Sequence, residues 1–381
     1  PGPRKPARRT SCYSVHPEAP LPCPDMPPRR PTAPPPIPYP YLRGRGTLLG
    51  LAVGDALGGP LKSRRLPAPL FPQLADGPYR EPRAGGPFEL RRGQVGESSQ
   101  MATCIAWSLF ELGHYDEEDV LRRYLAWQEH AVGMSDHTRE VMTELAESSP
   151  PMRLTAGRRV WQRSFRRAAG NGSLARTAPL GVFFFRDPQA RMQASLADSA
   201  LTHFDPCCQL ACAALNGSIS HALGAGGKLE PEHLITAALS GLSVASAALG
   251  RSAADFVREV SDATAFLKED LAAASREDPQ LYGPELHLHQ KADHVRVAFR
   301  LAYWELLHAA SFEAGVVDVI NRGGDADVNG AVTGALLGAF YGEEAIPTEW
   351  RQAVLEALGP WGSGPLWTTW HPRHLLQVAP D

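Results

Sequence analysis

The chain has 381 residues, of which 43% are hydrophobic and 21% are charged, so it is long enough to bury the core of a large domain. Its formal net charge of −3 excludes the strongly basic composition of many nucleic-acid-binding proteins, and we expect no nucleic-acid partner. We find no run of about 20 apolar residues and expect no membrane partner.

The first 42 residues differ in kind from the rest of the chain. They are rich in proline and arginine, as in PPRRPTAPPPIPYPY over residues 27–41, and contain no apolar run that suits a signal peptide. We therefore expect residues 1–42 to form a disordered tail and residues 43–381 to form a single domain. The six cysteines lack the spacing of a disulfide framework, which favours a cytoplasmic protein.

The first element of the domain is an expected helix over Gly46–Leu61, with the sequence GTLLGLAVGDALGGPL. Gly50, Gly54 and Gly58 recur every four residues, so one face of this helix carries no side chains and a second helix can approach it closely. Asp55 lies next to this face.

Apolar residues recur at helical spacing through most of the middle of the chain, and strand patterns are weak. The sequence therefore predicts an all-α fold. The expected helices are Ser99–Leu112, Asp119–His130, Glu140–Ala146, Cys207–Leu223, Glu232–Leu249, Ala253–Ala274 and Val295–Ala309.

A short polar loop, Gly170-Asn171-Gly172-Ser173, interrupts this helical pattern. Successive backbone N–H groups in such a loop form an anion-binding nest, and Arg176 nearby offers a further cation. The alternative is an ordinary turn, because short glycine-rich segments are usually turns.

The last clear element begins with GGDADVNGAVTGALLGAFYG, from Gly323 to Gly342. A Gly-Gly turn followed by Asp325 and Asp327 at a helix start directs two hard oxygen ligands to one place, which suits Mg²⁺ with a phosphate or sugar hydroxyl. The alternative is a polar cap on a buried helix. Gly330, Gly334 and Gly338 repeat the four-residue ladder, so we expect this helix to pack on the first one and to bring Asp55 near the two aspartates.

Five segments in this order resemble the ADP-ribosylglycohydrolase family. They are GLAVGDALGGPL (Gly50–Leu61), GQVGESSQMA (Gly93–Ala102), GNGSLARTAPLG (Gly170–Gly181), THFDP (Thr202–Pro206) and the segment from Gly323 to Gly342. The resemblance implies a compact orthogonal bundle of many helices. It also implies a loop at Gly170–Ser173 that binds the diphosphate of ADP-ribose, and it places His203 near the substrate.

The family's two Mg²⁺ ions are held by an early Thr-Asp-Asp-Thr motif and a late Asp-x-Asp-Thr motif. This chain has Gly96-Glu97-Ser98-Ser99 at the first motif and ends the second with Val328. Asp325 and Asp327 are intact, Glu97 offers a carboxylate one methylene further out, and Ser98 offers a hydroxyl. The resemblance therefore implies a non-standard magnesium site with one or both ions absent.

A second departure from the family pattern is Lys62, at a position where the family usually has an acid that assists catalysis. We expect its ammonium group to pair with Asp325, Asp327 or Glu97 and to occupy the space of a metal ion. The alternative is a lysine that points into solvent.

Two functions follow from the resemblance. The first is hydrolysis of an N- or O-glycosidic bond to ribose in a small ADP-ribosyl or related compound or in an ADP-ribosylated protein, with Glu97, Asp55 and Lys62 as catalytic residues. The second is binding of an ADP-ribose-type ligand by a catalytically inactive protein, because several acidic positions of the motifs are lost.

Overall fold

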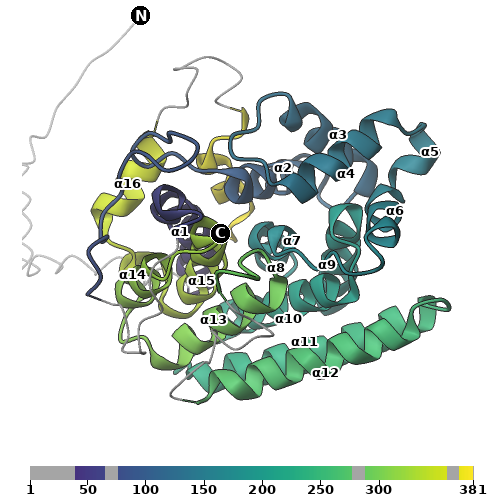
Figure 1. Ribbon diagram of the computed structural model, residues 1–381. Helices are drawn as coiled ribbons and strands as arrows, with labels where there is room; N and C mark the ends of the chain where they lie inside the picture. Colours follow the sequence, from purple (N-terminus) through teal and green to yellow (C-terminus); the bar gives the residue numbers. More distant parts are fainter. Residues whose placement is uncertain (1–38, 65–75, 277–287, 358–368, 381) are drawn as a thin grey trace, which may run out of the picture. The chain divides into compact units, whose positions relative to one another are not determined.

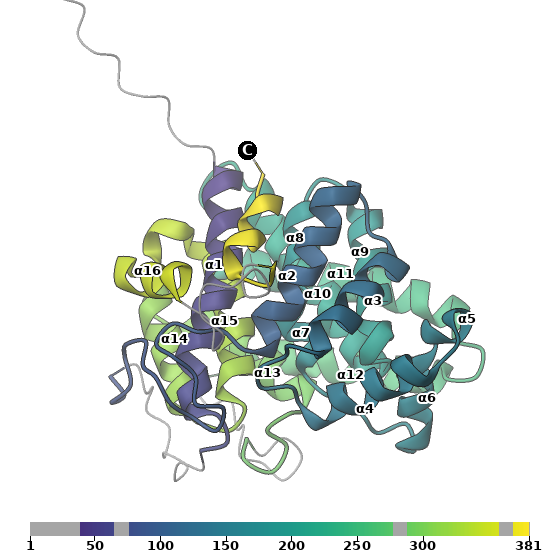
Figure 2. The ribbon, with the colours of Figure 1, turned by 90° about the horizontal axis from the view of Figure 1, so that it is seen from above.

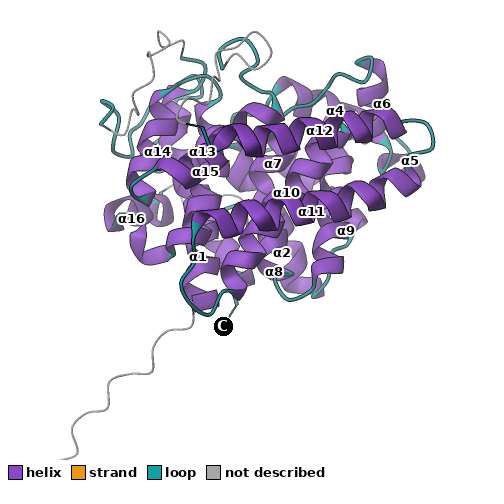
Figure 3. Cartoon of the chain, turned by 90° about the horizontal axis from the view of Figure 1, so that it is seen from below, coloured by secondary structure: helices purple, strands orange, loops and turns teal. Residues whose placement is uncertain are grey.

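The computed structural model describes residues 39–64, 76–276, 288–357 and 369–380. Within these ranges the chain forms sixteen α-helices and three short 3-10 helices, and no strand is present there (Figure 3). The expectation of an all-α fold is confirmed.

The helices follow one another with short connections. The α-helices are α1 (Tyr39–Gly58), α2 (Glu97–Leu112), α3 (Glu117–Gln128), α4 (Asp136–Glu147), α5 (Pro150–Arg153), α6 (Ala156–Arg163), α7 (Gly172–Arg176), α8 (Ala178–Phe183), α9 (Pro188–Thr202), α10 (Pro206–Gly224), α11 (Pro231–Ser252), α12 (Val257–Ala274), α13 (Val295–His308), α14 (Phe312–Asn321), α15 (Ala326–Tyr341) and α16 (Thr348–Glu356). The 3-10 helices are η1 (Gly59–Leu61), η2 (Glu343–Ala345) and η3 (Pro372–Val378).

The expected helices in the middle of the chain are all present, with shifted ends. The helix expected at Glu140 begins at Asp136, because Ser135 accepts a hydrogen bond from the Thr138 N–H and so caps α4. The helix α1 begins at Tyr39, four residues before the expected start of the domain, and the first 38 residues lie outside the described part.

The glycine faces of α1 and α15 pack against each other, as the sequence predicts. A Cβ atom at Gly50 would collide with the backbone of Gly334, and one at Gly54 would collide with the backbone of Gly330. The two helices run antiparallel at backbone contact, so the end of α1 lies beside the start of α15 (Figure 2). This pairing brings the regions around Asp55 and Asp325 together.

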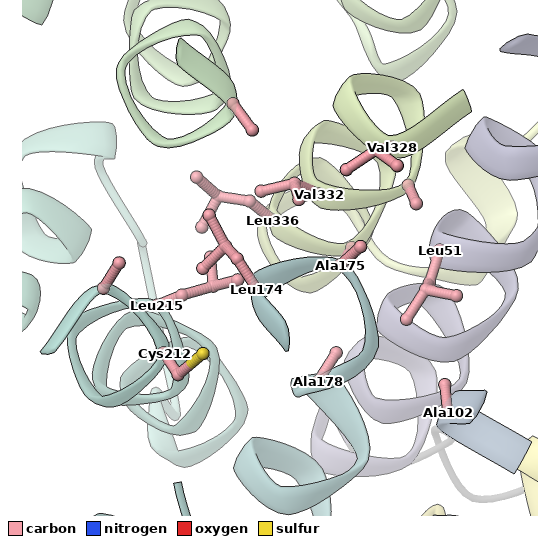
Figure 4. Packing of buried hydrophobic residues seen from close by; sticks show 14 of the residues in the cluster. Leu51, Ala102, Leu174, Ala175, Ala178, Cys212, Leu215, Val328, Val332 and Leu336 are labelled. Carbon is pink, nitrogen blue, oxygen red and sulfur yellow. The ribbon is translucent and has the colours of Figure 1, made fainter. Parts of the chain in front are cut away.

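The opposite face of α15 contributes to the main hydrophobic core. Val332 and Leu336 point toward Leu174 of α7, and Leu215 of α10 lies beside them (Figure 4). Because α7 begins at Gly172, inside the segment Gly170–Ser173, this packing also fixes the loop against the start of α15.

The helix pair α11 and α12 lies along one edge of the bundle (Figure 1). Among the described helices α11 alone has the length and composition of a membrane span, which differs from our expectation that the chain contains no such segment. One face of α11, formed by Leu234, Ala238, Leu242, Ala245 and Leu249, is buried against its neighbours in this domain.

Candidate functional site

The two aspartates lie at the amino end of α15, where the backbone makes a tight turn. Gly323 and Gly324 have φ values of 72° and 64°, which favour glycine because a Cβ atom strains this conformation. The Gly324 carbonyl accepts a hydrogen bond from the Ser63 N–H at 2.7 Å, and the Gly324 N–H donates to the Arg64 carbonyl at 3.0 Å. This backbone pairing holds the segment after η1 against the start of α15.

Lys62 consequently lies directly over the two carboxylates. Its Nζ is 2.5 Å from Asp325 Oδ1 and 2.8 and 2.9 Å from Asp327 Oδ1 and Oδ2, and its side chain is 15% exposed. Burial lowers the pKa of Lys62, but the two carboxylates outweigh this effect, so its pKa lies above the ordinary lysine value. The ammonium group pairs with Asp325 and Asp327 as expected, and it makes no hydrogen bond to Glu97 within the described residues.

The buried acid Asp327 is 7% exposed, and burial raises its pKa to about 7. The ammonium group of Lys62 acts in the opposite direction and the carboxylate of Asp325 in the same direction. Asp327 therefore holds a proton closer to neutral pH than an ordinary aspartate does.

The polar loop reaches the same place from the other side. Asn171 Nδ2 donates to Asp325 Oδ2 at 2.8 Å, and the Asn171 N–H donates to the Asp293 carbonyl. Every carboxylate oxygen of the Asp325–Asp327 pair thus accepts a hydrogen bond from Lys62 or Asn171. We call Lys62, Asn171, Asp325 and Asp327 the Lys62 cluster.

The rest of the loop is less open to a ligand than the sequence suggests. The Ser173 hydroxyl is fully buried and accepts a hydrogen bond from Ser199, so it faces the core. Arg176 is fully buried in an ion pair with Asp198 at 3.0 Å, so its expected role as a cation for phosphate is wrong. The backbone N–H groups at the start of α7 are what this loop offers to an anion.

His203 lies against this loop. A Cβ atom at Gly172 would lie 2.9 Å from the His203 ring, so glycine is needed for this contact. His137, which the sequence does not single out, packs against His203 with ring centroids 4.6 Å apart and the rings tilted by 58°. Burial lowers the pKa of His203 well below its ordinary value, and His137 and Arg176 add to this effect, so the ring is neutral at pH 7.

Asp55 is fully buried at the start of α2. Its carboxylate accepts hydrogen bonds from the N–H groups of Gly96 and Ser99 at 3.1 and 2.9 Å and from the Ser99 hydroxyl at 2.6 Å. Burial raises the pKa of Asp55, while these hydrogen bonds lower it. Asp55 is close enough to influence Asp327 electrostatically, as the sequence predicts, but its oxygens serve as the cap of α2.

Glu97 Oε1 lies beside the polar loop, 3.9 Å from where a Cβ atom at Gly172 would be, but the carboxylate is bound to α4. It accepts hydrogen bonds from the Ser135 N–H at 2.6 Å and the Thr138 hydroxyl at 2.5 Å, and so binds the start of α4. Ser98 is buried beside it on α2 and makes no hydrogen bond to Asp325 or Asp327 within the described ranges. Ser135 has the residue type of a helix N-cap. This signal in the sequence could have indicated that a helix starts there, with free N–H groups for the Glu97 carboxylate.

Comparisons with known proteins decide the family. The model of the ADP-ribosylglycohydrolase family matches residues 39–371. The chain belongs to this family. A putative ADP-ribosyl glycohydrolase of Acanthamoeba polyphaga mimivirus is 25% identical over 360 residues, which cover 87% of this chain and 98% of the relative.

Two bacterial relatives have more specific names. An ADP-ribosylarginine hydrolase of Pseudomonas putida is 24% identical and covers 82% of this chain and 74% of its own length. An ADP-ribosyl-[dinitrogen reductase] glycohydrolase of Rhodospirillum rubrum is also 24% identical and covers 81% of this chain and 88% of its own. A solved structure titled as an ADP-ribosylglycohydrolase-related protein complex superposes with a TM-score of 0.63 at 27% identity, over 90% of this chain and 98% of that one.

Members of the ADP-ribosylglycohydrolase family use magnesium ions, but the donors of this chain do not fit one. Octahedral Mg²⁺ needs oxygen ligands at about 2.0–2.1 Å. Here the ammonium group of Lys62 contacts the oxygens of both aspartates, and Glu97 is bound to Ser135 and Thr138. No group of three or more His, Cys, Asp or Glu side chains in the described ranges is arranged for a metal ion.

Proposed function

We propose that this protein binds an ADP-ribosyl or related ribosyl compound beside the Lys62 cluster and does not hydrolyse it efficiently. The ligand is a free small molecule or the modification on an ADP-ribosylated protein. One observation carries the proposal: Lys62, in place of the family's catalytic acid, is bound to Asp325 and Asp327.

Binding is supported by what the site retains. Asn171 joins the loop to Asp325, and the N–H groups of Gly172 and Ser173 lack intrahelical acceptors at the start of α7. A phosphate against these groups and a ribose beside the Lys62 cluster would have complementary hydrogen-bond partners. Family membership supports the ADP-ribosyl class of ligand.

Slow hydrolysis is supported by the partners of the three candidate catalytic residues. A general base needs a free lone pair and a pKa near the working pH. The raised pKa of Lys62 keeps it protonated and Asp55 accepts three hydrogen bonds, while Glu97 is bound to the start of α4. We assign no catalytic step to a magnesium ion.

Hydrolysis of an N- or O-glycosidic bond remains a second candidate, favoured by Asp327. Burial raises its pKa to about 7, so this acid is partly protonated at neutral pH and suits proton donation to a leaving group. The relatives named as ADP-ribosylarginine hydrolase and ADP-ribosyl-[dinitrogen reductase] glycohydrolase support the same reaction class.

The test combines binding with turnover on the full chain. We expect ADP-ribose to bind the wild type and ADP-ribosyl-arginine to stay intact overnight. We expect Asn171→Ala to weaken ADP-ribose binding by about tenfold, because its hydrogen bond to the charged Asp325 is lost. The Lys228→Ala variant, where 87% of the side chain is exposed, is the control and should bind like the wild type. Catalytic release of ADP-ribose that is lost in Asp327→Asn would favour the second candidate, and absence of ADP-ribose binding at millimolar concentration would refute the proposal.

A further inference from the structure

The Lys62 cluster has three features that are ordinarily found around a bound metal ion. A positive charge contacts three carboxylate oxygens from two aspartates, with distances between 2.5 and 2.9 Å. The carboxylates lie at a helix start and are largely buried, with side-chain exposures of 12% and 10%. The fourth oxygen is held by Asn171.

The position of the ammonium group is fixed by the backbone as well as by the carboxylates. Lys62 directly follows η1, whose Gly59 contacts Leu90, and precedes the pairing of Ser63 and Arg64 with Gly324. The side chain therefore starts from an anchored Cα and spans a fixed distance to α15. An exposed lysine such as Lys228, with 87% of its side chain accessible, has no comparable support.

Charge balance explains why the cluster is stable in this form. Two largely buried carboxylates without a cation would repel each other and lose hydration, which is costly. An ammonium group supplies one positive charge and three donors without the strict octahedral geometry that Mg²⁺ demands. A divalent ion could enter only by displacing Lys62 from its partners.

We propose that the ammonium group of Lys62 is the resident cation of this site, joining η1 to the start of α15, and that the protein assembles the site without a divalent metal ion. This goes beyond the proposed function because it concerns the protein without ligand. The proposal predicts that removing the ammonium group creates affinity for a divalent ion at Asp325 and Asp327.

The test measures metal ions alone, by calorimetry and by thermal unfolding with Mg²⁺, with Mn²⁺ and with chelator. For the wild type we expect no binding heat and the same Tm in chelator and in about 10 mM metal ion. For Lys62→Glu, which offers three carboxylates, we expect saturable binding heat and a rise in Tm of about 3 °C or more with metal ion.

Two further variants make the result interpretable. The matched control Lys228→Glu makes the same charge change at an exposed site and should behave like the wild type. Lys62→Met removes the ammonium group without adding a charge, and it should gain a smaller metal-dependent rise in Tm even if Lys62→Glu folds poorly.

Two outcomes would overturn the proposal. One is a wild-type protein whose Tm falls in chelator and recovers with Mg²⁺. The other is a metal response of both Lys62 variants that is no larger than that of Lys228→Glu. Because no ADP-ribose is present, these outcomes are independent of whether the ligand proposal holds.

Discussion

Two neighbouring regions of the molecule follow different physical rules. One is the seam, where Gly50 and Gly54 of α1 pack on Gly334 and Gly330 of α15, and the other is the Lys62 cluster at its end. In the seam, glycine backbones touch and any added side chain collides with a carbonyl group. In the cluster, what matters is the sum of charges, and an ammonium group can stand where another cation would. The close packing of the two helices can therefore be retained while the charged groups beside it change.

The largest expected effect comes from the seam. Gly54→Ala places a Cβ against the backbone of Gly330, and we expect a loss of about 3–5 kcal/mol in the free energy of unfolding, because neither helix backbone can move aside. The control is Gly250→Ala in α11, where a Cβ meets no atom within 4 Å and helix propensity should add about 0.5–1 kcal/mol. Urea unfolding of both variants checks this, and equal effects would contradict the close packing.

The next effect comes from the cluster. Lys62→Met leaves Asp325 and Asp327 without their cation, and we expect a loss of about 2–3 kcal/mol at pH 7. The loss should shrink in Lys62→Met combined with Asp325→Asn and Asp327→Asn, since the repulsion is then also removed. Additive losses in the combined variant would show that the three side chains do not act together.

The pH dependence of stability also tests the contribution of Lys62. The pKa of Lys62 is raised in the folded protein, so its stabilising contribution is complete below the ordinary lysine value of about 10.5 and is lost as pH rises above it. The difference in unfolding free energy between wild type and Lys62→Met should therefore be constant from pH 8 to 10 and shrink above that. A difference that grows with pH in this range would have the wrong sign.

The smallest expected effect is at Glu97. Glu97→Gln keeps the shape but weakens two hydrogen bonds to the start of α4, for an expected loss of about 1 kcal/mol. ADP-ribose affinity should stay within about twofold, because the carboxylate faces Ser135 and Thr138. A large drop in affinity with unchanged Tm would instead place Glu97 in the ligand site.

The sequence was sufficient to predict the seam, because a four-residue glycine spacing directly determines which face of a helix is bare. The pairing of Lys62 with the aspartates was predicted only with the help of the family resemblance, and Glu97 and solvent stood as alternatives. The sequence did not show that Glu97 binds the start of α4 or that Arg176 is paired with Asp198, because both depend on side chains from elements far apart in the chain. Local spacing carries no information about such partners.

A site whose cation is Lys62 should recognise an ADP-ribose-type ligand without a divalent metal ion. Calorimetry of ADP-ribose binding to the full chain, with Mg²⁺ and again with chelator, tests it most directly. We expect the same dissociation constant in both conditions. Binding that appears with Mg²⁺ and disappears with chelator would contradict it.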